Sequence, residues 1–256
     1  MRARFAICLG LFATMAAPVF AQPAAPPAAP SAAPPAVAAQ PTPLSSADLA
    51  FGRNIALIRG HLLTGDELAA KGDWGAAAMH FAFPREEVYG LIRAEVKNYK
   101  VPAFDDALRE LVGAAKARNA KALVKPRQRV ETALNAADAG LKAKQPNWPR
   151  FTVAVALSIL KTAPDEHDDA VVKGRVVRPI GYQTARGYVL QAERMIEGVA
   201  GEFPGDNAAS LAEIRAGIAE LKAAQPAVTA PKETAFDDPA FQRAVARIEA
   251  AAAKLP

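Results

Sequence analysis

Apolar residues recur at spacings of three and four along most of the chain after residue 45, which is the period of amphipathic α-helices. The clearest stripe runs through Tyr182, Ala185, Val189, Ala192, Ile196, Val199 and Phe203. Small alanines alternate with larger side chains in it, so a neighbouring helix is expected to approach closely. Because no convincing strand pattern interrupts these stripes, the sequence predicts an all-α fold, an antiparallel bundle of about eight to ten helices.

Shorter stripes and helix-start signals predict the other helices. The start signals are Ser45 with Asp48, Asp73, Pro84 and the pair Asp238-Pro239. Apolar stripes cover residues 51–62, 88–99, 104–115, 123–141, 151–160, 211–221 and 241–255. The stretch 151–160 is apolar on nearly every side, so we expect it at the centre of the fold.

The helical pattern breaks near the middle of this region, over residues 144–149. Pro146 and Pro149 flank Asn147 there, which is typical of a loop followed by a new helix start. We therefore predict two packed helical halves, residues 45–145 and 146–256.

The beginning of the chain has a different character, because no charged residue occurs from Phe5 to Ala47. Arg2 and Arg4 precede an apolar run that ends in small residues at Ala21, as in a secretory signal peptide of residues 1–21 cleaved near Ala21. The signal predicts a periplasmic or secreted protein. No later apolar run reaches the roughly 20 residues that span a bilayer, so we expect no transmembrane segment after cleavage.

Residues 22–44 consist mostly of alanine and proline. Proline removes backbone donors and disfavours helix, and alanine offers little surface to bury, so this segment is predicted to be a disordered, extended linker. It could tether the folded part away from a membrane or partner, or act as an inert spacer.

Charge and cysteine content narrow the function classes. Loss of Arg2 and Arg4 lowers the formal net charge from +5 to +3, and both signs are mixed along the chain. Nucleic-acid binding needs clustered basic residues, so no nucleic-acid partner is expected. The single cysteine, Cys8, leaves with the signal, so the mature chain has neither a disulfide nor a cysteine-based metal site.

The three histidines each lie near acidic residues, and His61 and His80 fall on consecutive helices that could form a hairpin. Together with Glu87 and His167 they form a candidate transition-metal site for iron, zinc or copper, since imidazole and carboxylate are suitable donors. The competing interpretation is that His80 packs beside Phe81 in the core.

No arrangement of nucleophile and base, phosphate loop or nucleotide motif is evident, so we expect no enzyme activity. The acidic run 165–169 follows Pro164, as expected for the first turn of a helix rather than a calcium loop. Trp74, Tyr182 and Glu193 are candidate interaction residues; Tyr182 and Glu193 lie along or beside the apolar stripe described above.

Two resemblances follow from these patterns. Residues 68–81, with Gly72-Asp73 before Trp74 and small alanines, resemble the junction of a tetratricopeptide repeat, which implies a protein-interaction module. The order of signal, linker and serial helices resembles periplasmic helical-bundle proteins, including the imelysin-like iron-uptake group. That group's His-x-x-Glu motif is absent here.

We therefore predict an exported, non-enzymatic helical-bundle protein that binds a protein partner or small ligand in a cleft between its two halves. One alternative is a periplasmic transition-metal-binding protein that uses the histidines and a carboxylate. A second is a tetratricopeptide-like interaction module around Trp74. No other cofactor is expected.

Overall fold

The fold is built almost entirely from α-helices, as the apolar spacing predicts. The computed structural model describes residues 44–234 and 237–256. The predicted signal and all of the linker before Leu44 lie outside the described residues. The main helices are α1 (Ser46–Ala70), α2 (Trp74–Phe83), α4 (Asp105–Lys116), α5 (Ala120–Lys142), α6 (Trp148–Leu160), α7 (Ala163–Ala170), α8 (Pro179–Val199), α9 (Ala208–Ala224) and α10 (Asp238–Ala252).

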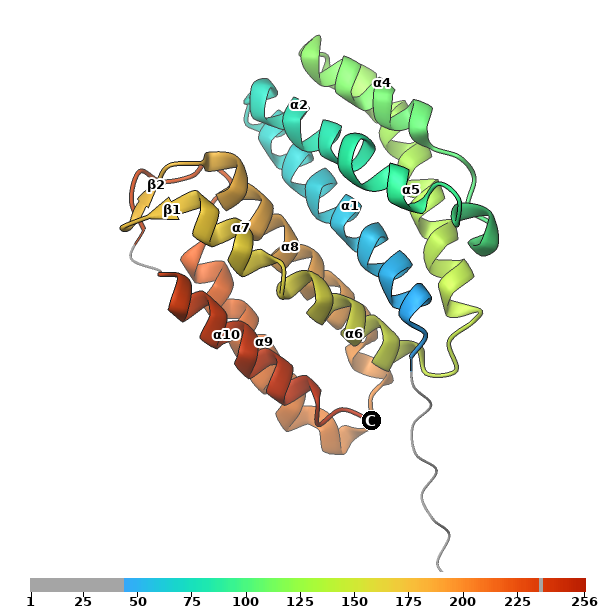
Figure 1. Cartoon of the computed structure of the whole chain (residues 1–256), viewed down its shortest axis with the longest axis vertical. Coiled ribbons are helices and arrows are strands. Elements are labelled where there is room, and N and C mark those ends of the chain that lie inside the picture. Colours follow the sequence, from blue (N-terminus) through green and yellow to red (C-terminus); the bar gives the residue numbers. More distant parts are fainter. Residues whose placement is uncertain (1–43, 235–236) are drawn as a thin grey trace, which may run out of the picture. The chain divides into compact units, whose positions relative to one another are not determined.

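Helix α1 lies at the centre of the bundle (Figure 1) and packs against α2, α5, α6 and α8. Its start is fixed by Ser45, whose hydroxyl accepts a hydrogen bond from the backbone N–H of Asp48. The predicted stripe is fully buried: Phe51, Ile55, Ile58 and Leu62. This helix therefore joins the two predicted halves through one apolar core.

The first half continues as a helical hairpin. Gly72 takes a left-handed conformation with φ of 83°, and Asp73 caps α2 by accepting a hydrogen bond from the N–H of Ala76. Helix α2 packs on α4, and α4 packs on α5.

The prediction of a single helix after Pro84 was wrong, because the structure has three short helical segments there. A π turn (Pro84–Val88) leads into α3 (Tyr89–Ile92) and a 3-10 turn (Val96–Tyr99). The apolar stripe Val88, Ile92, Val96 and Tyr99 is nevertheless buried, so the core contacts survive the change in helix type.

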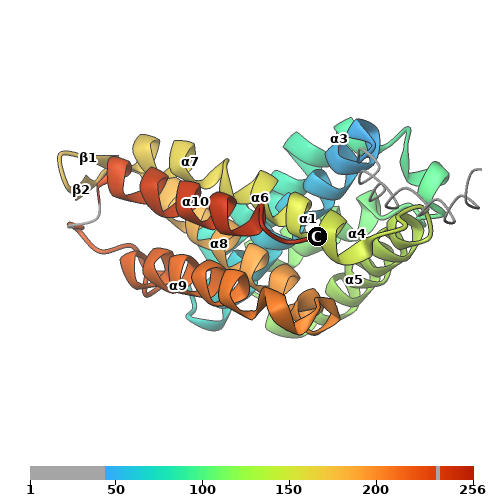
Figure 2. The same cartoon turned by 90° about the horizontal axis from the view of Figure 1, so that it is seen from below.

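The second half is organised around α8, which packs against α6, α7 and α9, while α9 and α10 lie side by side (Figure 2). The predicted stripe is confirmed from Tyr182 to Val199, whose residues are buried, but α8 ends at Val199, and Phe203 lies beyond it in extended backbone and is half-buried. Helix α10 is capped by Asp237 rather than by Asp238, one residue earlier than the sequence suggested.

The sequence analysis also missed a short β-hairpin between α7 and α8. Strands β1 (Val171–Val172) and β2 (Arg175–Val176) pair antiparallel around Lys173 and Gly174, which have φ of 50° and 75°. This pair of left-handed residues is typical of a two-residue hairpin turn. Two-residue strands are too short to give an alternating pattern in the sequence.

None of the described helices is both long and apolar enough to cross a membrane. The most apolar predicted segment, residues 151–160, forms most of α6, and it is buried against α1 and α8 within the protein.

Candidate functional site

A cleft of about 470 Å³ lies between α1 and α5 of the first half and α6 and α8 of the second. This volume is in the range of small-molecule sites in proteins. Its apolar surface is formed by Ile55, Ala56, Leu63, Leu141, Trp148, Phe151, Val155, Met195 and Val199. Its polar surface is formed by Arg59, Arg127, Glu131, Asn135, Asp138, Thr152, Gln191 and Arg194.

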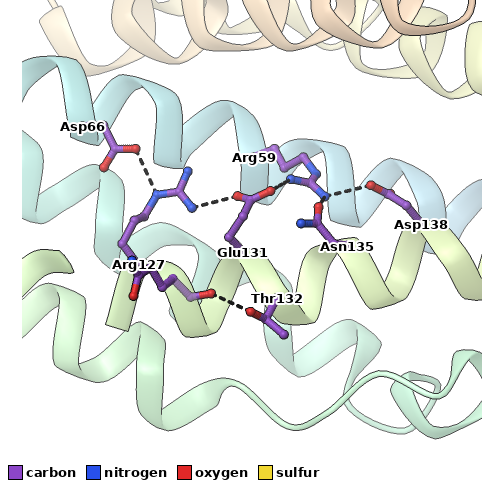
Figure 3. Close-up of polar contacts among 8 residues, drawn as sticks. Arg59, Asp66, Arg127, Glu131, Thr132, Asn135 and Asp138 are labelled. Atoms are coloured by element: carbon purple, nitrogen blue, oxygen red, sulfur yellow. Dashed lines mark hydrogen bonds and ion pairs between the residues drawn. The ribbon is translucent and has the colours of Figure 1, made fainter. Parts of the chain in front are cut away.

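One wall of the cleft is a network of ion pairs between α1 and α5 (Figure 3). The Arg59 guanidinium donates to Glu131 at 2.5 Å, to Asp138 at 2.8 Å and to Asn135 at 2.9 Å. Because the Arg59 side chain is only 16% exposed, these bonds are partly shielded from water. They hold α1 and α5 at a fixed register along the cleft.

A second arginine extends this network. Arg127 donates to Asp66 on α1 and to Glu131 on its own helix, both at 2.9 Å. Burial by itself would raise the pKa of Glu131, but the hydrogen bonds from Arg127 and Arg59 outweigh it and lower that pKa. Burial raises the pKa of Asp66 and of Asp138, with the arginines offsetting part of the effect. Each of these carboxylates is therefore already bound to an arginine.

A second polar cluster is enclosed where α1, α2 and α8 meet. The Nδ1 atoms of His61 and His80 lie 3.1 Å apart. The Tyr188 hydroxyl lies 3.1 Å from His61 Nε2, and Gln183 Oε1 lies 3.2 Å from His80 Nε2. All four side chains are at most 3% exposed. The ring of His61 also stacks on Phe83, with ring centroids 3.9 Å apart.

The contacts of this cluster are consistent with two neutral imidazoles. Burial, and next repulsion from His80, lowers the pKa of His61 well below its ordinary value, and burial lowers the pKa of His80 to about 4. Gln183 Oε1 can only accept, so His80 Nε2 carries its proton and His80 Nδ1 accepts from His61. His61 Nε2 then accepts from the Tyr188 hydroxyl. One tautomer of each ring thus satisfies all three hydrogen bonds that link Gln183, His80, His61 and Tyr188.

The four predicted metal ligands do not come together. His61 and His80 meet, as the hairpin suggested, but Glu87 is exposed on the π turn after α2. His167 is buried in α7, where its ring lies 5.0 Å from that of Phe241. Within residues 44–234 and 237–256, no three His, Cys, Asp or Glu side chains form a group that could hold a metal ion.

The predicted interaction residues occupy three different settings. Trp74 lines a groove of about 450 Å³ between α2 and α4. Tyr182 is fully buried, which raises the pKa of its hydroxyl. Glu193 accepts a 2.7 Å ion pair from Lys222 of α9. Of these residues, Trp74 borders the groove between α2 and α4, whereas Tyr182 and Glu193 do not line the cleft or this groove.

The cleft residues escaped the sequence analysis, although part of their pattern is visible. Arg127, Glu131, Asn135 and Asp138 follow one another at spacings of four, four and three, so they form a polar stripe on one face of α5. Their partner Arg59 lies 72 residues before Glu131, a separation that no local pattern reveals.

Residues 142–255 match a protein-family model described as "Iron permease-associated 4-helix bundle domain". The second half of the chain is similar to that domain. No curated protein and no solved structure matches the chain. The matched range contains α6 to α10 and therefore one of the two walls of the cleft.

Proposed function

We propose that this chain is an exported, non-enzymatic binding protein that supports an iron permease, and that its ligand or partner occupies the cleft between α1, α5, α6 and α8. The observation that carries the proposal is the cleft itself, which both predicted halves line and which has an apolar floor beside a fixed polar wall. The similarity of residues 142–255 to an iron permease-associated bundle supports the link to iron. The predicted signal peptide supports a site of action outside the cytoplasm.

The test is an iron-uptake measurement in cells that lack the chain and carry a plasmid-borne variant. Gly198 of α8 borders the cleft, and a Cβ added to it would meet no neighbouring atom within 4 Å, so Gly198→Trp adds a bulky ring at the cleft without a backbone clash. Gly113 on the exposed face of α4 is equally open and does not border the cleft, so Gly113→Trp is the matched control.

The proposal predicts that loss of the chain lowers iron uptake, that Gly113→Trp restores it and that Gly198→Trp does not. Unchanged uptake in cells without the chain would contradict the link to the permease. Full restoration by Gly198→Trp would show that the cleft is not the working site.

A second candidate function is direct transition-metal binding by His61 and His80. Two neutral imidazoles in contact are suitable donors, and the family description names an iron permease. A tetrahedral metal that binds both Nδ1 atoms at about 2.0–2.1 Å places the two nitrogens about 3.3 Å apart, close to the observed 3.1 Å, so the metal would mainly have to replace the proton between them. Elemental analysis of the purified mature protein, with His80→Gln as the comparison, tests this candidate. Stoichiometric metal that the variant lacks supports it, and metal-free protein contradicts it.

A further inference from the structure

The second wall of the cleft carries polar groups that form no hydrogen bond with any other residue of the described ranges. Gln191, Arg194, Met195 and Gly198 lie at helical spacing on the face of α8 that borders the cleft. Gln191 is 5% exposed, and its side-chain amide makes no hydrogen bond to any described residue. The Gln191 amide still reaches the water of the cleft, so it offers a ligand an open hydrogen-bond donor and acceptor.

Two other cleft residues, Thr152 and Arg194, also form no side-chain hydrogen bond to a described residue. The Thr152 hydroxyl on α6 is buried and has no hydrogen-bond partner among the described residues. Arg194, exposed at the edge of the cleft, forms neither an ion pair nor a hydrogen bond within the described chain. It acts on Asp66 only through its charge, which lowers the pKa of that carboxyl in part.

The charges of the cleft favour an anionic ligand over a bare cation. Glu131 and Asp138, the carboxylates that line it, already accept hydrogen bonds from Arg59 or Arg127, and Asp66 behind them is bound to Arg127. A metal ion would have to break these pairs to gain oxygen ligands. Arg194 is the cleft arginine with no carboxylate bonded to it in the described residues, and a guanidinium is a strong partner for a carboxylate group.

The apolar part of the cleft indicates the rest of the ligand. Trp148 and Phe151 of α6 stack with ring centroids 5.7 Å apart, and Met195 of α8 borders the same cavity. Aromatic rings and a methionine sulfur pack well against a planar apolar body. A cavity of about 470 Å³ accommodates a small organic molecule rather than a protein segment.

We infer that the cleft binds a small aromatic carboxylic acid, with its carboxylate on Arg194 and Gln191 and its ring against Trp148 and Met195. This inference rests on the proposed function, whose ligand it names by chemical class. The acid could be free, or it could be an iron chelator that holds Fe(III) through other oxygens; both sources present the same carboxylate.

The test is isothermal titration calorimetry on the full mature chain with four probes: benzoate, benzamide, 2,3-dihydroxybenzoate and its ferric complex. Benzamide has the ring without the charge. Arg194→Gln removes the cleft arginine that has no carboxylate partner among the described residues, and Arg243→Gln on the exposed face of α10 is the matched control, since Arg243 has no ion pair in the described chain.

We expect one or more of the acids to bind, benzamide to bind at least about tenfold more weakly than benzoate, and Arg194→Gln to weaken the acid by at least about tenfold. Arg243→Gln should bind like the unaltered protein. If the ferric complex binds more tightly than free dihydroxybenzoate, the ligand of the cleft is the iron chelate. If the free acid binds more tightly, the ligand is the free acid.

Equal affinity for benzoate and benzamide, unchanged affinity in Arg194→Gln, or no binding of any acid would overturn the inference. The proposed function fails separately: if Gly198→Trp still abolishes iron uptake while no acid binds, only the ligand class is wrong. If Gly198→Trp leaves uptake intact and an acid binds through Arg194, the ligand class stands without the role in iron uptake.

Discussion

The buried pair His61 and His80 should make the protein sensitive to mild acid. In the unfolded chain a histidine takes up a proton as the pH falls through its ordinary pKa of 6.5, whereas folded His80 does so only near pH 4. The unfolded state therefore binds more protons between these values, and stability falls as the pH drops through that window. Above about pH 6.5 the contribution is fully present.

The size of the effect follows from the shift. One pKa unit corresponds to about 1.4 kcal/mol. Because the pKa of His80 is 6.5 in the unfolded chain and about 4 in the folded protein, acidification from neutral pH to about pH 4 lowers the free energy of unfolding by about 3 kcal/mol. His61, whose pKa is lowered in the same direction, adds to this loss. Typical domains have about 5–15 kcal/mol of stability in total, so the loss is easily measured.

The substitution that tests this is His80→Gln, which keeps a polar side chain and removes the titrating ring. Urea unfolding followed by circular dichroism at about pH 7 and about pH 4.5 gives the free energy of unfolding of both proteins. The variant should be less stable than the unaltered chain at neutral pH, but its loss on acidification should be smaller by about 2–3 kcal/mol. Equal slopes of unfolding free energy against urea in both proteins serve as the control for two-state behaviour. Parallel pH dependence of the two proteins would refute the reasoning.

Three other predictions concern packing, the ion-pair network and export. Gly187→Ala should lower the free energy of unfolding by about 1–3 kcal/mol, since its Cβ would lie 2.4 Å from Thr64 Oγ1 where α8 crosses α1. Gly113→Ala should raise the free energy of unfolding by about 0.5–1 kcal/mol, because a Cβ at this position of α4 meets no atom and alanine favours the helix over glycine. Urea titration of the two variants decides this, and equal effects would contradict the close approach of α1 and α8. Arg59→Met should cost about 1–3 kcal/mol in the same assay, because it leaves Asp138 without an arginine donor and Glu131 with Arg127 alone; a neutral effect would mean that water replaces the arginine. Intact-mass analysis of protein from the periplasmic fraction should show a chain that begins after Ala21, and uncleaved protein in the cytosol would contradict the predicted export.

Local patterns in the sequence were sufficient for much of the helical fold. The spacing from Tyr182 to Val199 predicted the buried face of α8, and Asp73 predicted both the start of α2 and the hairpin that brings His61 to His80. These features depend on residues close together in the chain, where helical period and capping act directly.

Features that depend on distant residues could not be predicted in the same way. The contact between Arg59 and Glu131 arises only when α1 and α5 pack, and the Tyr188 hydroxyl reaches His61 across 127 residues. Glu87 appeared to be a suitable third ligand because it is near His80 in sequence, but the π turn directs it to solvent. The open amide of Gln191 has no signature in the sequence, since only the packed structure shows that it bonds to none of the other described residues.

The sharpest test of the cleft as the working site is to block it chemically in living cells. The only cysteine in the chain is Cys8 within the predicted signal, so Gly198→Cys gives the mature protein a single thiol at the cleft, and Gly113→Cys gives the control thiol on α4. Iron uptake is measured before and after treatment with a bulky maleimide that does not cross the inner membrane. We predict that treated Gly198→Cys cells lose most of the uptake that depends on this chain while treated Gly113→Cys cells keep it. Full uptake in labelled Gly198→Cys cells would contradict a working role for the cleft.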